Sequence, residues 1–262
     1  MLSRIVLVFV VAVLGVEKAR GEEPPELVTD RPDQTESSVV VLPGFVQIEV
    51  GTTYTGQGED GQRTRILEAP GTLFRIGLVD RIELRLGTTG WSRQGGGSEG
   101  GFGDSELGAK IYFWEEAGGR PETALLTAVS LPTGSDGLST KRVDPSFRFA
   151  FSHTLSERVS FGYNLGAYWE TEVLGDSPQD RLSFFLYTVT AGIGLTDRLG
   201  TFVELYGDAP MNGDGGAAHS LDGGFVFLVH KNFQLDVHVG KGLSEVADEW
   251  SIGGGISVRL PR

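Results

Sequence analysis

The stretch from Phe147 to Trp169 reads FRFAFSHTLSERVSFGYNLGAYW and decides the class of fold. Apolar residues alternate with small or polar ones on both sides of a short polar centre, as in Phe149 and Phe151 before it and Phe161 and Tyr163 after it. Successive side chains of a β-strand point to opposite faces, so this period of two predicts a hairpin with one apolar and one polar face. A soluble sandwich buries the apolar face, whereas a membrane barrel turns it toward lipid and keeps the polar face toward a wet interior. The rest of the chain has to distinguish these two folds.

The same alternation recurs along the chain and predicts twelve strands. Apart from the first one, each is separated from the strand before it by a turn or a loop rich in polar residues. The expected strands are centred on residues 46–54, 74–78, 82–86, 107–113, 123–132, 147–151, 159–169, 185–193, 203–205, 225–229, 233–239 and 250–260.

The connections between these strands alternate in length, which favours the barrel. Five are short, at residues 78–81, 115–121, 155–158, 195–198 and 230–232. Six are longer and richer in Gly, Asp and Ser, at residues 55–68, 92–102, 133–143, 170–180, 208–218 and 242–248. Short periplasmic turns and longer outer loops, with an even strand number, are typical of outer-membrane barrels. We therefore predict an all-β, up-and-down antiparallel transmembrane β-barrel of about 12 strands, in contact with outer-membrane lipid and with both termini in the periplasm.

The N-terminus predicts export from the cytoplasm. An apolar run at residues 5–16 follows Arg4 and is too short to cross a bilayer as a helix. The segment that follows, EKARG (17–21), carries small residues at Ala19 and Gly21, which fit a cleavage site. We expect residues 1–21 to be a signal peptide. Because the chain contains no cysteine, lipoprotein processing, disulfides and thiolate chemistry are excluded.

The charge of the chain argues against a nucleic-acid partner. The formal net charge is −13, and removal of residues 1–21 leaves 19 Lys and Arg against 34 Asp and Glu, a net charge of −15. A nucleic-acid-binding protein would instead carry a basic patch.

Residues 22–44 differ from the rest of the chain and form a separate unit. This segment, EEPPELVTDRPDQTESSVVVLPG, is rich in proline and charge and has little to bury. We expect it to be a periplasmic N-terminal arm, followed by the barrel over residues 45–262. Two placements of the arm remain open, as part of a plug inside the barrel or as a disordered periplasmic lead.

The predicted inward face carries charged and polar residues that are candidates for lining a pore. They are Gln47, Glu49, Arg75, Glu83, Arg85, Glu106, Lys110, Arg148, Asn164, Glu204, Asp222, Asp236, His238 and Arg259. Pairing across the turn at residues 78–81 should bring Arg75 close to Glu83. Such groups either form the charged rings that set the selectivity of a pore, or they are buried ion pairs that fill and stiffen the interior. Twelve strands enclose a narrow lumen, between the eight that side chains fill and the 16 to 18 of open porins.

Catalytic and metal sites are not indicated. Of the four histidines only His238 falls on the predicted inward face, and no nucleophile elbow accompanies it. The acidic, glycine-rich segment GDAPMNGDGG (207–216) lacks the Asp spacing of a calcium loop. We predict no enzymatic activity, no cofactor and no metal.

Four segments together resemble one family of outer-membrane proteins. They are TDRPDQTESSVVVLPGFVQIEVG (29–51), GLVDRIELRLG (77–87), SLPTG (130–134) and SLDGGFVFLVHKNFQLDVHVGKGLS (220–244). The family is named after the meta-cleavage pathway of phenol degradation, and its members are described as transporters. The resemblance implies an outer-membrane barrel that passes small hydrophobic or aromatic molecules, and it supplies no catalytic residues.

Three functions follow as hypotheses. The first is a channel or transporter for a small-molecule solute, and the second is a plugged barrel that serves a structural or surface-binding role without transport. The third, an outer-membrane hydrolase, would depend on His238. In all three cases the outer-membrane assembly machinery is an expected partner. The chain ends RLPR where barrels usually end on an aromatic residue. Either insertion uses another terminal signal, or the last strand closes less tightly.

Overall fold

The computed structural model describes residues 25–59, 62–95, 100–174, 177–213 and 215–262, so the expected signal peptide lies outside the described residues. In these ranges the regular structure is entirely β. Among the same residues, no helix is long and apolar enough to cross a bilayer. The strands are β1 Phe45–Glu59, β2 Gln62–Val79, β3 Ile82–Thr88, β4 Trp91–Gln94, β5 Gly101–Phe102, β6 Ser105–Trp114, β7 Glu122–Leu131, β8 Asp144–Ser156, β9 Val159–Leu174, β10 Ser177–Gly194, β11 Leu199–Pro210, β12 Ala218–His230, β13 Phe233–Gly242 and β14 Trp250–Pro261.

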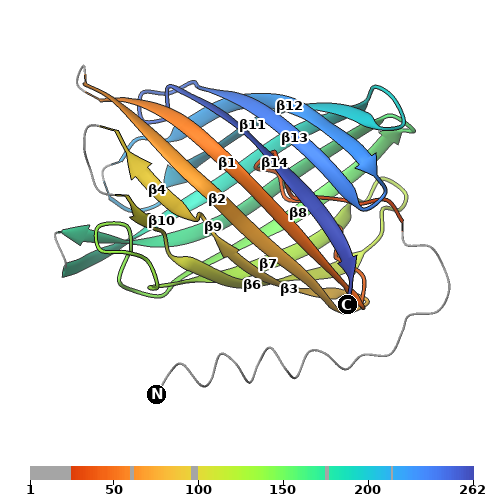
Figure 1. Ribbon diagram of the computed structural model, residues 1–262, viewed down its shortest axis with the longest axis horizontal. Helices are drawn as coiled ribbons and strands as arrows, with labels where there is room; N and C mark the ends of the chain where they lie inside the picture. The colour runs from red at the N-terminus through yellow and green to blue at the C-terminus, as the bar shows by residue number, and fades with distance from the viewer. Residues whose placement is uncertain (1–24, 60–61, 96–99, 175–176, 214) are drawn as a thin grey trace.

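Twelve of these strands close into one antiparallel barrel (Figure 1). Each pairs with its neighbours in chain order, and β1 pairs with both β2 and β14. The closing ladder runs without a register shift over 12 residue pairs, from Phe45 opposite Pro261 to Gly56 opposite Trp250. The short strands β4 and β5 continue the β3–β6 pair beyond a break near Gly90. The predicted up-and-down barrel of about 12 strands is confirmed, and its last strand closes fully.

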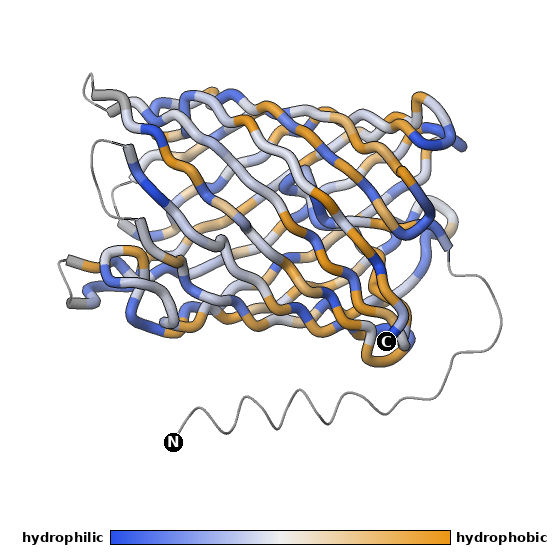
Figure 2. The backbone as a smooth tube through the Cα atoms, viewed as in Figure 1, coloured by the Kyte–Doolittle hydropathy of each residue, from blue (hydrophilic) through white to orange (hydrophobic). Residues whose placement is uncertain are grey.

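The distribution of apolar side chains is the inverse of that in a soluble protein. On β13, Val237 and Val239 are 55% and 59% exposed, whereas Asp236 and His238 between and beside them are 4% and 7% exposed. Figure 2 shows this alternation of hydrophobic and hydrophilic residues along the strands. Soluble proteins almost never bury Asp, Glu, Lys or Arg while leaving neighbouring aliphatic residues outside. The exposed apolar face is therefore the one that meets lipid.

The stretch that predicted the fold forms β8 and β9. Its inward neighbours Ala150 and Asn164 are opposite each other and fully buried. On the other face Phe151 and Tyr163 are opposite each other, and their rings stack with centroids 4.8 Å apart. The predicted polar and apolar faces of this hairpin are present in the barrel wall.

The five short turns are confirmed, but two of the predicted long loops are wrong. Residues 55–68 and 170–180 were expected to be loops, yet strand pairing continues through most of both ranges, in β1 with β2 and in β9 with β10. The physical reason is that backbone hydrogen bonds hold a ladder together whether or not its side chains are apolar, so these strands extend past the lipid-facing region.

Candidate functional site

All of the predicted pore-lining residues lie on the inner face of the barrel. Residues directly opposite each other in an antiparallel ladder share a face, and the register carries one face around the wall. Apart from Gln47, the list contains thirteen candidates, and eleven of these are buried, namely Glu49, Arg75, Glu83, Arg85, Lys110, Asn164, Glu204, Asp222, Asp236, His238 and Arg259. The other two, Glu106 and Arg148, line an open cavity described below. Gln47, on the same face, is also buried.

The N-terminal arm, residues 25–44, lies inside the barrel wall (Figure 1) and forms hydrogen bonds with inward side chains. Its backbone enters beside the β12–β13 turn, where the amide of Leu27 donates to the carbonyl of Lys231. Further along, arm amides donate to side chains on four different strands of the wall. These bonds join Asp30 to Glu49, Gln34 to Glu204, Glu36 to Asn164 and Val41 to Glu83. Of the two placements left open by the sequence, the structure has the arm within the lumen.

A buried charge cluster holds the arm against one side of the wall. The strands β1, β2, β3 and β6 contribute three cations, Arg75, Arg85 and Lys110, and two anions, Glu49 and Glu83. The wall alone would therefore leave one buried positive charge without a partner. Asp30 of the arm supplies the missing negative charge, because it forms ion pairs with all three cations. We call these six residues the charge cluster.

The geometry of the charge cluster is that of direct hydrogen-bonded ion pairs. The Arg75 Nε to Glu83 Oε1 distance is 2.9 Å, which confirms the predicted cross-strand pair. Arg75 Nη1 lies 3.1 Å from both Glu49 Oε1 and Asp30 Oδ2, and Lys110 Nζ lies 2.8 Å from Asp30 Oδ2. In these residues the structure has the second arrangement that the sequence left open, buried ion pairs inside the barrel.

The surroundings in the lumen shift the pKa values of two arm carboxyl groups in opposite directions. Burial alone would raise the pKa of Asp30, but Arg75, Lys110 and Arg85 together hold it well below its usual range. Burial raises the pKa of Asp33 well above its usual range, and the neighbouring carboxyl of Glu204 raises it further. The charge of Asp30 is thus stabilised by the docked position of the arm, and that of Asp33 is not.

Sequence reasoning placed neither Asp30 nor the other arm residues Arg31 and Glu36 in the site. Glu36 forms an ion pair with Arg85, with its Oε2 atom 2.8 Å from Arg85 Nη2. The dense run of Asp, Arg, Glu, Thr and Ser in residues 29–38 was the available signal, because so many side-chain hydrogen-bonding groups suit a polar interior as well as water.

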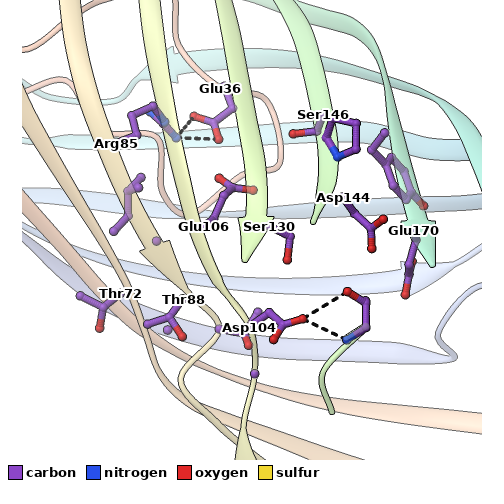
Figure 3. Close-up of a pocket in the computed structure, with 18 of the residues that line it drawn as sticks. Glu36, Thr72, Arg85, Thr88, Asp104, Glu106, Ser130, Asp144, Ser146 and Glu170 are labelled. Carbon is purple, nitrogen blue, oxygen red and sulfur yellow. Dashed lines mark hydrogen bonds and ion pairs between the residues drawn. The ribbon is translucent and has the colours of Figure 1, made fainter. Parts of the chain in front are cut away.

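A cavity of about 590 Å³ lies between the arm and the barrel end opposite the termini. Glu36, Arg31 and Arg85 belong to its lining on the side of the arm, and the wall residues come mainly from β2, β3 and β6 to β9. In Figure 3 the carboxylate of Glu36 faces the guanidinium of Arg85, while Glu106, Asp144 and Glu170 surround the open space. Most of the remaining lining is glycine or carries a hydroxyl group, as in Thr72, Thr88, Thr89, Thr140, Ser130 and Ser146.

The loop after β7 closes one edge of this cavity. Asp104, in the break between β5 and β6, accepts hydrogen bonds from the amides of Gly134 and Thr140, at 2.8 and 3.0 Å. Thr140 and Leu138 of the same loop line the cavity. Within the described residues, no group of three or more Asp, Glu, His or Cys side chains is arranged to hold a metal ion.

Comparison with known proteins places the barrel among outer-membrane proteins. The structure is similar to the COG4313 outer membrane channel from Pseudomonas putida F1, with a TM-score of 0.63, 16% identity, and 84% and 97% of the two chains covered. It is also similar to the translocator domain of the autotransporter NalP from Neisseria meningitidis (TM-score 0.57, 12% identity, 82% and 88% covered) and to the NanC porin (TM-score 0.54, 7% identity, 82% and 100% covered). At these identities the likeness establishes the fold: an outer-membrane β-barrel.

The sequence itself settles the family. No curated protein sequence matches the chain. The model of the family described as "Putative MetA-pathway of phenol degradation" matches residues 29–260, which include most of the arm as well as the barrel. The chain therefore belongs to this family.

Proposed function

We propose that the protein is an outer-membrane channel for small molecules, narrowed at its centre by the N-terminal arm. The observation that carries the proposal is the 590 Å³ cavity, which the closed wall surrounds and the arm bounds on one side. A cavity whose lining contains nine charged residues together with hydroxyl groups and glycines is a wet space, and its size suits a small solute.

The lining favours solutes that combine a flat apolar part with polar groups. Tyr168 lines the cavity, and its ring stacks on that of Phe184 with centroids 4.8 Å apart and planes 13° apart. Hydroxyl groups such as those of Ser130 and Ser146 offer hydrogen bonds nearby. A small aromatic compound with hydroxyl or carboxyl substituents fits both features and agrees with the description of the family.

The arm supports a second candidate, a plugged barrel without transport that has a structural or surface-binding role. Asp30 neutralises the charge cluster and Glu36 pairs with Arg85, so the docked arm is firmly held. The two candidates predict different permeability for the same fold.

Solute entry into liposomes separates these candidates. Purified protein reconstituted into liposomes should accelerate swelling in isotonic arabinose and in 4-hydroxybenzoate, with the aromatic solute entering faster than a neutral sugar of similar mass. Heat-unfolded protein at the same protein-to-lipid ratio is the control. Swelling equal to that of the control for every solute would remove the channel proposal and leave the plugged barrel.

The orientation follows from the lengths of the connections. The turns at the end that carries both termini are short, and outer-membrane barrels place short turns in the periplasm. In the proposed orientation the arm docks from the periplasm and the cavity opens toward the outside. Insertion by the outer-membrane assembly machinery belongs to the same proposal.

A further inference from the structure

The two sides of the lumen differ in how well their polar atoms are paired. On the side of β2, β3 and β6, the charge cluster satisfies its members through direct ion pairs. On the adjoining strands β7 and β8 the inward residues Ala124 and Ala150 are fully buried, and Ser38 of the arm packs there with hydrogen bonds to Glu122 and Ser152. The arm therefore seals this side.

The strands β12, β13 and β14, which adjoin β1 on its other edge, carry buried polar atoms that have no protein partner. They are Asp222 Oδ1, Asp236 Oδ2, His238 Nδ1 and Ser257 Oγ, and Arg31 Nε of the arm lies beside them. Among the described residues these are five of the six buried side-chain nitrogen and oxygen atoms without a hydrogen bond. Buried polar groups in native proteins are almost always paired with protein or with water, so such a concentration marks a place that water reaches.

The wall on this side is rich in inward-facing glycines. Glycines stand opposite the unpaired residues in the register: Gly240 opposite Asp222, Gly255 opposite Asp236, and Gly224 and Gly253 opposite His238. These positions lie on the inner face because opposed residues share a face. A Cβ atom at Gly253 would meet the His238 ring, one at Gly255 the Arg31 guanidinium and one at Gly240 the Ser251 hydroxyl, so side chains that can change rotamer occupy the lumen beside the unpaired atoms.

An arm side chain lies beside this part of the wall. Arg31 reaches toward β13, where its Nη2 atom lies 3.1 Å from Asp236 Oδ1. Its guanidinium occupies the place where a Cβ atom at Gly51 or Gly255 would stand. The Arg31 side chain retains some exposure, 21%, whereas the side chains of Arg75 and Lys110 in the charge cluster have none.

We infer that the path past the arm runs between Arg31 and the inner faces of β12, β13 and β14, and that Asp222, Asp236 and His238 are the residues a solute meets there. This inference rests on the proposed channel function and names its route.

The absence of cysteine from the chain allows a direct test. Ser257→Cys and Ala150→Cys place a thiol at two inward positions that are equally inaccessible in the static structure, each 0% exposed. Ser257 lies on the inferred path, and Ala150 lies on the sealed side. Both variants are reconstituted into liposomes and treated with a small cationic methanethiosulfonate, and the modified fraction is followed by mass spectrometry. Heat-modifiable migration on gels verifies that each variant has folded.

We expect the thiol at position 257 to react at least tenfold faster than the thiol at position 150. Equal rates at the two positions, or a faster rate at position 150, would overturn the route.

The thiol measurement does not depend on conductance, so it separates this inference from the proposed function. Reaction at position 257 in a protein that passes no solute would reject the channel and keep the wet side of the lumen. Solute passage with an unreactive position 257 would keep the channel and reject the route.

Discussion

Asp30 is the residue on which the docked arm depends most. It is the one arm residue in the charge cluster, and it contacts three cations that come from β2, β3 and β6. Removing one partner from a buried ion-pair network leaves an uncompensated charge, which typically costs about 3–5 kcal/mol. The contact between Asp30 and its cations therefore determines whether the arm remains in the lumen.

Asp30→Asn should weaken arm docking, whereas Asp33→Asn should not. The asparagine at position 30 removes the charge that balances Arg75, Arg85 and Lys110, and docking should lose on the order of 3 kcal/mol. Asp33 lies near the carboxyl group of Glu204, so its neutralisation removes a repulsion. Limited proteolysis of the folded protein measures the fraction of arm released. Equal cleavage of the two variants would show that the charge cluster does not hold the arm.

The strands present apolar residues to lipid, and one substitution on β13 tests whether this face meets the bilayer. Val237, in the middle of β13, is 55% exposed, and a surface Val→Arg change in a soluble protein would be almost neutral. Facing the bilayer, Val237→Arg should cost about 2–4 kcal/mol. Folding into lipid vesicles, titrated with urea, measures the difference, with Val237→Leu as the matched control. Identical midpoints for the two variants would mean that this face does not meet hydrocarbon.

The sequence predicts the presence of the strands better than the positions of their ends. Alternation identifies β1 or β13 because one face must be apolar wherever it touches lipid or a core. It carries no information where a strand runs on into water, so the ends of β1, β2, β9 and β10 were assigned to loops. Alternation also does not distinguish the two faces of β7, because Ala124, Leu126 and Ala128 point inward and are apolar themselves.

The position of the arm could not be read from local sequence. Its contacts join residues far apart in the chain, such as Arg31 and Asp236, which are 205 positions apart. The alternation of apolar and polar residues shows which face of the wall each residue lies on. It does not show whether the inward charged residues line an open lumen or form buried ion pairs, because that depends on what occupies the barrel. That choice differs between the two sides of the lumen, with paired charges at the charge cluster and unpaired polar atoms near β12 to β14.

The whole molecule is a closed barrel with apolar residues outside, charged residues inside and part of its own chain in the lumen. The arm contacts side chains on β1, β2, β3, β6, β9, β11 and β13, so its docking site is complete only when the barrel has closed. The closing pair β1–β14 contains no arm residue, and the barrel wall is continuous without the arm. The arm is therefore an added constriction and not a structural requirement of the wall.

Single-channel recording in planar bilayers, on the full chain and on a variant that lacks residues 25–40, tests the channel and its constriction together. Both proteins should conduct, and the variant should conduct several-fold more because the arm no longer occupies the lumen. Both proteins are first verified as folded. The absence of current through both of them, or equal currents through the two, would contradict this account.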